Sequence, residues 1–235
     1  MSDVARRIAE NLAQVRGHVA AAAQRSGRPA DAVKLVAVTK YLDVEFAAHL
    51  VEAGCTELGE SRPQELWTKA PALSHHAIHW HLIGHLQRNK IHRTLPLLSL
   101  MHSVDSRRLL TALDQEAALL GRPVAVLLEV NISGDITKTG LSPDALGPIL
   151  EKTAEWRYLS VRGLMGMASL TGGVATAQRD FARLRDLRDR LAKDCPPEVS
   201  LRELSMGMSG DFEVAIEEGA TIVRIGSALF EGIDP

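Results

Sequence analysis

The sequence of 235 residues lacks several features that mark specialised classes of protein. It has two cysteines, Cys55 and Cys195, too few and too far apart for a disulfide framework or a structural zinc site. No apolar run is long enough to cross a bilayer. Residues 1–16 are charged and helical in pattern, unlike a signal peptide. We therefore expect a cytoplasmic protein that does not contact the membrane.

The sequence also lacks an excess of positive or negative charge. The 27 basic and 29 acidic side chains give a net charge of −2, which provides no electrostatic reason to expect nucleic-acid binding. We find no linker rich in proline, glycine or serine, no low-complexity tract and no internal repeat. Residues 1–235 are therefore predicted to form a single domain.

What the chain does have is a regular alternation of strand and helix patterns. Residues 3–24 repeat apolar side chains every three or four positions, which predicts a first helix. Strand-like runs follow at 34–39, 55–59, 78–84, 100–104, 124–132, 161–167, 201–206 and 222–225. Helical patterns between them cover 43–54, a helix beginning at 61–64 with a capping box, 106–120, 142–156, 177–193 and 212–218.

Helix-sized connections between successive strands favour parallel pairing. The simplest arrangement is a single (β/α)8 TIM-type barrel preceded by one extra N-terminal helix. A doubly wound open sheet is the alternative.

Chemistry in such a barrel lies at the carboxyl ends of the strands, and phosphate groups often bind the last two loops. Lys40 follows the first strand, and Arg224 lies within the eighth. The loops after strands seven and eight carry Ser209, Gly226 and Ser227, which suit a phosphate cradle. An amine beside a phosphate cradle indicates a site for an aldehyde that carries a phosphate.

Each of these residues also has a purely structural interpretation. Lys40 alone would be read as a solvated lysine. Arg224 would be read as half of an ion pair with a core carboxylate, because a buried cation needs a partner. Lys138 would be read as a surface lysine, although an anion contact is the alternative.

Six histidines lie between positions 75 and 92. His79 and His81 share one face of the predicted third strand, as metal ligands do. Because no carboxylate or cysteine completes the set nearby in the sequence, we expect these histidines to hydrogen-bond structural groups and predict no metal site.

Taken in order, the motifs resemble the pyridoxal phosphate homeostasis proteins, whose fold is like the N-terminal barrel of alanine racemase. The most specific are the run from Trp80 to Lys90 and the run from Leu204 to Ser209 followed by Asp211. Further matches span nearly the whole chain, at 36–40, 59–60, 131–134, 162–165, 215–216 and 223–226.

The resemblance implies that the chain binds pyridoxal 5′-phosphate. It implies that Lys40 forms the Schiff base and that Arg224 faces the pyridine nitrogen. The remaining site residues would be Ser209, Gly226 and Ser227 at the phosphate, with Met206 and Met208 lining the site. Such proteins buffer or deliver the cofactor, with apo forms of cofactor-dependent enzymes as candidate recipients and no established reaction. We expect a monomer.

Two positions depart from the family pattern. Ser61 stands where an asparagine is usual, which puts a side-chain contact to the cofactor in question. Leu42 stands where many members have a second lysine, so a transfer route through that lysine does not operate here.

Two enzymatic interpretations compete with a carrier. An amino-acid racemase needs a second acid or base facing the lysine, and alanine racemase takes it from another domain. Tyr41 adjoins Lys40 and would point to the opposite face of the strand, and an arginine at the ring nitrogen weakens the electron sink. A phosphosugar aldolase or isomerase would share the phosphate cradle but lacks these motifs.

Overall fold

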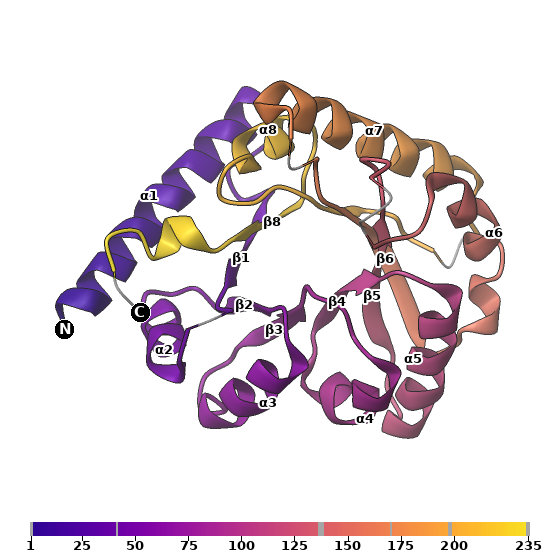
Figure 1. Ribbon diagram of the computed structural model, residues 1–235, viewed down its shortest axis with the longest axis horizontal. Coiled ribbons are helices and arrows are strands. Elements are labelled where there is room, and N and C mark those ends of the chain that lie inside the picture. Colours follow the sequence, from indigo (N-terminus) through magenta and orange to yellow (C-terminus); the bar gives the residue numbers. More distant parts are fainter. Residues whose placement is uncertain (1, 41, 136–138, 170, 197–198, 234–235) are drawn as a thin grey trace.

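The strands close into a parallel barrel in the order of the chain (Figure 1). The computed structural model describes residues 2–40, 42–135, 139–169, 171–196 and 199–233. The strands are β1 (Lys34–Val38), β2 (Glu57–Glu60), β3 (His79–Leu82), β4 (Leu100–Val104), β5 (Val124–Val130), β6 (Leu159–Gly166), β7 (Glu203–Ser205) and β8 (Ile222–Ile225). Because β1 pairs with both β2 and β8, the predicted barrel is confirmed and the open sheet is excluded.

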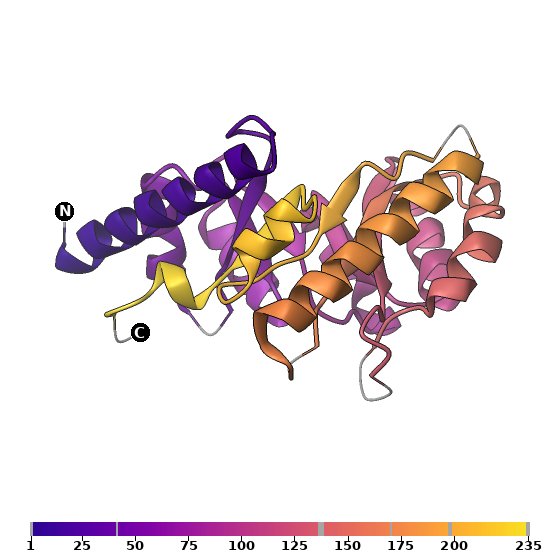
Figure 2. The ribbon, with the colours of Figure 1, turned by 90° about the horizontal axis from the view of Figure 1, so that it is seen from above.

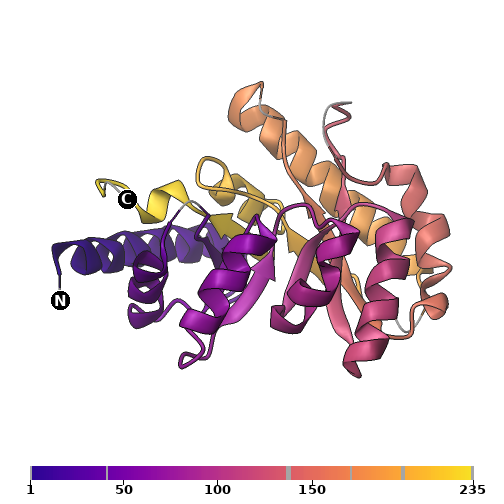
Figure 3. The same cartoon turned by 60° about the horizontal axis from the view of Figure 1, so that its bottom comes forward.

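Helices cover the outside of the barrel between successive strands. They are α1 (Asp3–Arg25), α2 (Val44–Glu52), α3 (Pro63–Ala72), α4 (Ile91–Thr94), α5 (Arg107–Leu120), α6 (Leu146–Leu150), α7 (Gly173–Asp194) and α8 (Phe212–Glu217). Figure 3 shows the helices that follow the early strands in succession along one side. No helix in the described ranges combines the length and the apolar character needed to span a membrane.

The extra helix α1 packs against the end of the chain. The Ser2 hydroxyl accepts a hydrogen bond from the Ala5 N–H and caps the first turn. On its buried face, the Asn11 amide donates to the carbonyls of Leu229 (3.2 Å) and Glu231 (3.0 Å). Figure 2 shows α1 beside this C-terminal segment. The helix therefore anchors the segment that follows β8.

Two local predictions were wrong. No capping box forms at 61–64, because Arg62 occupies the N-cap and its side chain makes no capping hydrogen bond, although Pro63 does begin α3. The helix predicted over 142–156 is broken into two 3₁₀ turns, Pro143–Ala145 and Thr153–Glu155, on either side of α6. Proline at position 148 lies within α6 and has no N–H to donate to the carbonyl of residue 144, which disfavours a regular helix through Pro143–Ala145.

The side chains of the strands fill two separate spaces. Outward residues join the large core between the barrel and the helices. Inside the barrel is a small apolar cluster of Val36, Leu100, Leu127, Met165 and Ile222. Polar side chains occupy much of the remaining barrel interior, and they lead to the candidate site.

Candidate functional site

Lys40 directly follows β1, at the carboxyl end of the barrel, and its side chain is exposed. The preceding residue, Thr39, is fully buried. The Thr39 hydroxyl donates to Glu60 Oε1 at 2.5 Å, and Lys69 Nζ donates to the Thr39 carbonyl at 2.8 Å. A buried polar cluster of Thr39, Glu60 and Lys69 therefore fixes the backbone immediately before Lys40.

That cluster centres on a buried ion pair. Lys69 Nζ lies 2.7 Å from Glu60 Oε1, and both side chains are almost inaccessible. Burial raises the pKa of Glu60, although Lys69 and Thr39 oppose the shift. Glu60 Oε2 is buried without a hydrogen-bond partner among the described residues. Sequence reasoning missed Lys69, whose only signal is its position on the face of α3 that also buries Leu66 and Ala70.

Arg224 points into the barrel from β8 and is only 4% exposed. Its Nη1 donates to Ser205 Oγ at 2.6 Å, and its Nη2 donates to the Gly166 carbonyl at 3.1 Å. Burial lowers its pKa to about 10, so it remains a cation at neutral pH. The ion pairs of the described residues do not include Arg224, so a direct pair with a core carboxylate was the wrong structural interpretation.

The loops after β7 and β8 meet at the carboxyl end of the barrel. Ser209 Oγ accepts hydrogen bonds from the N–H groups of Gly226 (3.2 Å) and Ala228 (3.4 Å). Gly207 has φ +92°, and a Cβ there would lie 2.6 Å from the Ala215 Cβ, so only glycine allows this path. Two backbone donors therefore converge on one oxygen, an arrangement that also suits an anion.

The other predicted site residues lie around this junction. Ser227 is exposed and begins a short 3₁₀ turn, Ser227–Leu229. Met208 is 37% exposed, whereas Met206 is fully buried in the core between the barrel and the helices. The structure thus brings Ser209, Gly226 and Ser227 together, and the roles of the two methionines remain predictions. Tyr41 and Lys138 lie outside the described residues.

The histidines of β3 contact a carboxylate that sequence reasoning missed. Glu57, on β2, accepts from His79 Nδ1 (3.0 Å) and His81 Nε2 (2.6 Å), so the absence of a nearby carboxylate was a wrong inference. Inside the barrel, His81 Nδ1 lies 2.8 Å from Nε2 of His102, on the adjacent strand β4. No cluster suited to a metal ion occurs in the described part of the chain, and the contacts are those of hydrogen-bonded structural histidines.

Two polar residues lie at the carboxyl end of β5, Glu129 within the strand and Asn131 directly after it. Glu129 is buried, which raises its pKa, and it accepts a hydrogen bond from the Thr139 hydroxyl at 2.7 Å. The Asn131 side chain accepts from the Gly134 N–H (3.1 Å) and donates to the Asp135 carbonyl (2.7 Å). Asn131 therefore stabilises its own loop.

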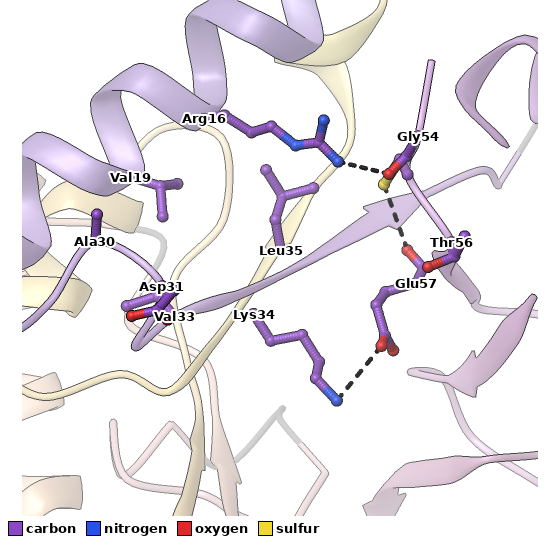
Figure 4. Close-up of a pocket in the computed structure, with 11 residues that line it drawn as sticks. Arg16, Val19, Ala30, Asp31, Val33, Lys34, Leu35, Gly54, Thr56 and Glu57 are labelled. Carbon is purple, nitrogen blue, oxygen red and sulfur yellow. Dashed lines mark hydrogen bonds and ion pairs between the residues drawn. The ribbon is translucent and has the colours of Figure 1, made fainter. Parts of the chain in front are cut away.

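A pocket of about 470 Å³ opens at the opposite end of the barrel (Figure 4). It lies between α1 and the amino ends of β1 and β2, where Arg16 Nη2 donates to the Gly54 carbonyl at 2.7 Å. Lys34 Nζ and Glu57 Oε1, 3.5 Å apart, line its floor. Because Lys40 lies at the other ends of the strands, this pocket is not the predicted site.

Comparison with known proteins assigns the chain to a family. The family model described as the alanine racemase N-terminal domain matches residues 7–234. The pyridoxal phosphate homeostasis protein of Aquifex aeolicus is 38% identical, with 94% of this chain and 96% of that protein covered. The one from Pseudomonas aeruginosa is 37% identical, with 97% and 96% covered. The chain belongs to the pyridoxal phosphate homeostasis protein family.

Solved structures agree with this assignment. A protein of unknown function from Bifidobacterium adolescentis is 37% identical, with a TM-score of 0.92 and coverage of 98% of this chain and 97% of that chain. PipY of Synechococcus elongatus with pyridoxal phosphate bound is 35% identical, with a TM-score of 0.83 and coverage of 95% and 99%. Alanine racemase of Clostridium difficile, 15% identical over 95% of this chain and 56% of that chain with a TM-score of 0.74, shares the fold alone. The predicted family resemblance is confirmed.

Proposed function

We propose that this chain binds pyridoxal 5′-phosphate at the carboxyl end of the barrel and serves intracellular homeostasis of that cofactor without catalytic turnover. The observation that carries the proposal is the pair of N–H groups, from Gly226 and Ala228, that converge on Ser209 Oγ. A phosphate oxygen can accept from the same donors. The cofactor-bound structure of PipY, a relative at 35% identity, supports the choice of ligand.

Lys40 supplies the amine. When bound, the cofactor provides an aldehyde that condenses reversibly with a primary amine. Lys40 lies at the end of β1, which pairs directly with β8, the strand that ends beside the phosphate cradle. The polar cluster of Thr39, Glu60 and Lys69 holds its backbone. These residues therefore orient the attachment point.

Arg224 supplies a cationic donor for the pyridine nitrogen. Its pKa of about 10 keeps the guanidinium protonated at neutral pH. Donation from a cation favours an unprotonated ring nitrogen, which is a weak electron sink. This is the physical reason to propose storage and delivery of the cofactor rather than amino-acid chemistry.

The attachment site is tested directly. The purified protein, incubated with pyridoxal phosphate, should show a visible absorption band that is lost in Lys40→Ala and kept in the matched variant Lys90→Ala. Borohydride reduction followed by peptide mass mapping should place the added mass on Lys40. Label on another lysine would refute the assignment.

The phosphate site is tested by comparing two ligands. Ser209→Ala should weaken binding of pyridoxal phosphate by roughly 10- to 150-fold, the cost of one hydrogen bond to a charged group. Binding of unphosphorylated pyridoxal should change much less. Equal losses for both ligands, measured by fluorescence titration, would place the phosphate elsewhere.

Turnover and assembly need separate measurements. Exchange of the α-proton of alanine with deuterated solvent, followed by NMR, should not exceed the rate with free cofactor, whereas rapid exchange would revive the racemase interpretation.

We propose that the protein acts as a monomer and passes the cofactor to apo enzymes. Sedimentation analysis and transfer assays with an apo cofactor-dependent enzyme test these points.

A further inference from the structure

A continuous chain of hydrogen bonds crosses the barrel interior from Arg224 to Glu57. Arg224 Nη1 lies 2.6 Å from Ser205 Oγ, which lies 2.8 Å from His102 Nδ1. His102 Nε2 is 2.8 Å from His81 Nδ1, and His81 Nε2 is 2.6 Å from Glu57 Oε2. The five residues come from β2, β3, β4, β7 and β8.

The two ends of this chain have opposite chemistry. A guanidinium has only donors, and an ionised carboxylate has only acceptors. Although burial opposes it, the hydrogen bond from His81, with help from Lys34 and His79, holds the pKa of Glu57 at about 2. Glu57 is therefore ionised at neutral pH and accepts from His81.

These ends impose one direction on every bond between them. His81 must carry its proton on Nε2, which makes its Nδ1 an acceptor for the Nε2–H of His102. The Nδ1 of His102 then accepts from the Ser205 hydroxyl, whose oxygen accepts from Arg224. One proton on each bridging group satisfies every hydrogen bond in the chain. Both imidazoles are thereby assigned as neutral Nε2–H tautomers.

A proton added to either imidazole would break this arrangement. On His81 it would reverse the His81–His102 hydrogen bond, force His102 into the Nδ1–H tautomer and place a cation in the barrel interior. Protonated His102 would compete with the Ser205 hydroxyl as a donor and would place a second cation near Arg224. Burial lowers the pKa of His102 well below its usual value, and the charges of Arg224 and Lys34 act in the same direction. Burial also lowers the pKa of His81, where Glu57 opposes the shift and Lys34 and His79 add to it.

We propose that Glu57, His81, His102 and Ser205 are positioning residues that fix the orientation of the Arg224 guanidinium from the far end of the barrel. The chain supplies the acceptor for Nη1, and the Gly166 carbonyl supplies the acceptor for Nη2. All hydrogen bonds of this chain point from the buried cation Arg224 toward the carboxylate of Glu57. The role toward the cofactor rests on the proposed placement of Arg224 at the pyridine nitrogen.

The tautomers can be measured without any cofactor. In ¹⁵N-labelled apoprotein, long-range ¹H–¹⁵N NMR should show His81 and His102 as neutral Nε2–H tautomers between about pH 6 and 8. Glu57→Gln keeps an acceptor for His81 and should preserve both tautomers. Glu57→Met removes it and should alter the tautomer of His102, two groups away, as well as that of His81.

A matched control distinguishes coupling from local damage. His79→Gln removes the contact to the other oxygen of Glu57 and should leave the His81 and His102 signals unchanged. A protonated or Nδ1–H imidazole in the wild type would overturn the proposal, as would a His102 signal that does not respond to Glu57→Met. If Glu57→Met does not fold, the wild-type and Glu57→Gln tautomers decide the question.

The effect on the site is measured at the ligand. Ser205→Ala should weaken pyridoxal phosphate binding by roughly 10- to 150-fold and shift its absorption band, and Ser205→Thr, which keeps the hydroxyl, should restore both. Binding and absorption unchanged in Ser205→Ala would refute the positioning role. If Lys40 takes up no cofactor but both histidines are Nε2–H tautomers, the proposed function fails and the hydrogen-bond chain is supported. If Lys40 is labelled but either histidine is not the neutral Nε2–H tautomer, only this inference fails.

Discussion

The core between the barrel and the helices and the core inside the barrel are filled by different kinds of side chain. The outer core consists mainly of leucine, valine, isoleucine and alanine. Inside the barrel, five apolar residues share the space with two histidines, a serine and an arginine that are almost inaccessible. Apolar residues stabilise wherever they are buried, whereas buried polar groups are tolerated only when partners satisfy them. The comparison indicates that the outer core is built mainly to stabilise the fold, whereas the inner one depends on polar groups that satisfy one another.

The largest effect is expected where the outer core breaks this pattern, at the ion pair of Lys69 and Glu60. Lys69→Met should reduce the free energy of unfolding by about 3–5 kcal/mol at pH 8, because it leaves a buried carboxylate without its cation. Loss of Lys69 raises the pKa of Glu60 further, so the cost should grow as pH rises and shrink toward pH 5.

Urea unfolding at the two pH values measures this difference. The double variant Lys69→Met, Glu60→Met serves as the control and should recover most of the loss. A cost that does not depend on pH would show that the pair is not the cause.

A smaller effect is expected in the apolar part of the outer core. Leu82 is fully buried on β3 and faces the helices. Leu82→Ala should reduce the free energy of unfolding by roughly 3 kcal/mol through lost transfer energy and a residual cavity. Between pH 5 and 8 the loss should be constant, since no ionisable group is involved. Chemical denaturation checks both points, and a strong pH dependence would contradict the contrast between the two cores.

The smallest effect is expected for Glu57→Gln inside the barrel, because the amide oxygen still accepts from His81 and only the extra stability of the ionised carboxylate is lost. The stabilities of the wild type and the variant should differ most at neutral pH and converge in acid. The pKa of Glu57 is about 2 in the fold against an ordinary value of 4.5, so its ionised form stabilises the wild type above about pH 4.5. That contribution is lost as pH falls through this window toward 2.

The variant lacks this ionisable group and should lose less stability over the same window. Thermal unfolding between pH 5 and 3 measures the difference. Parallel pH curves for the wild type and Glu57→Gln would show that the carboxylate is not stabilised by the interior chain.

Much of the site could be predicted from the sequence because its parts lie at strand ends. Lys40 and Arg224 belong to runs whose pattern indicates strands, and a parallel barrel brings such ends together. The meeting of Ser209 with Gly226 followed from the same topology, and the structure shows it as a hydrogen bond. Local composition was a weaker guide at 142–156, where the predicted helix is divided into α6 and two 3₁₀ turns.

The polar chain could not be predicted in the same way. Glu57, His81, His102 and Ser205 lie on four strands, and no short motif links them. Which side chains meet inside a barrel depends on strand register, for example the pairing of Gly59 with His81. The alternation along each strand indicates which residues face inward but not which of them lie at the same height.

By itself, the sequence determined the succession of strands and helices, the barrel, and the placement of Lys40 and of the glycine-containing loops at the ends of strands. These follow from periodicity and turn chemistry, which act between residues close in the chain. Only the tertiary structure decided that Ser209 receives two backbone N–H groups, that Lys69 pairs with Glu60, and that Arg224 is linked to Glu57 across the barrel. Buried hydrogen bonds need partners within about 3 Å, and closure of the barrel is what brings those partners together.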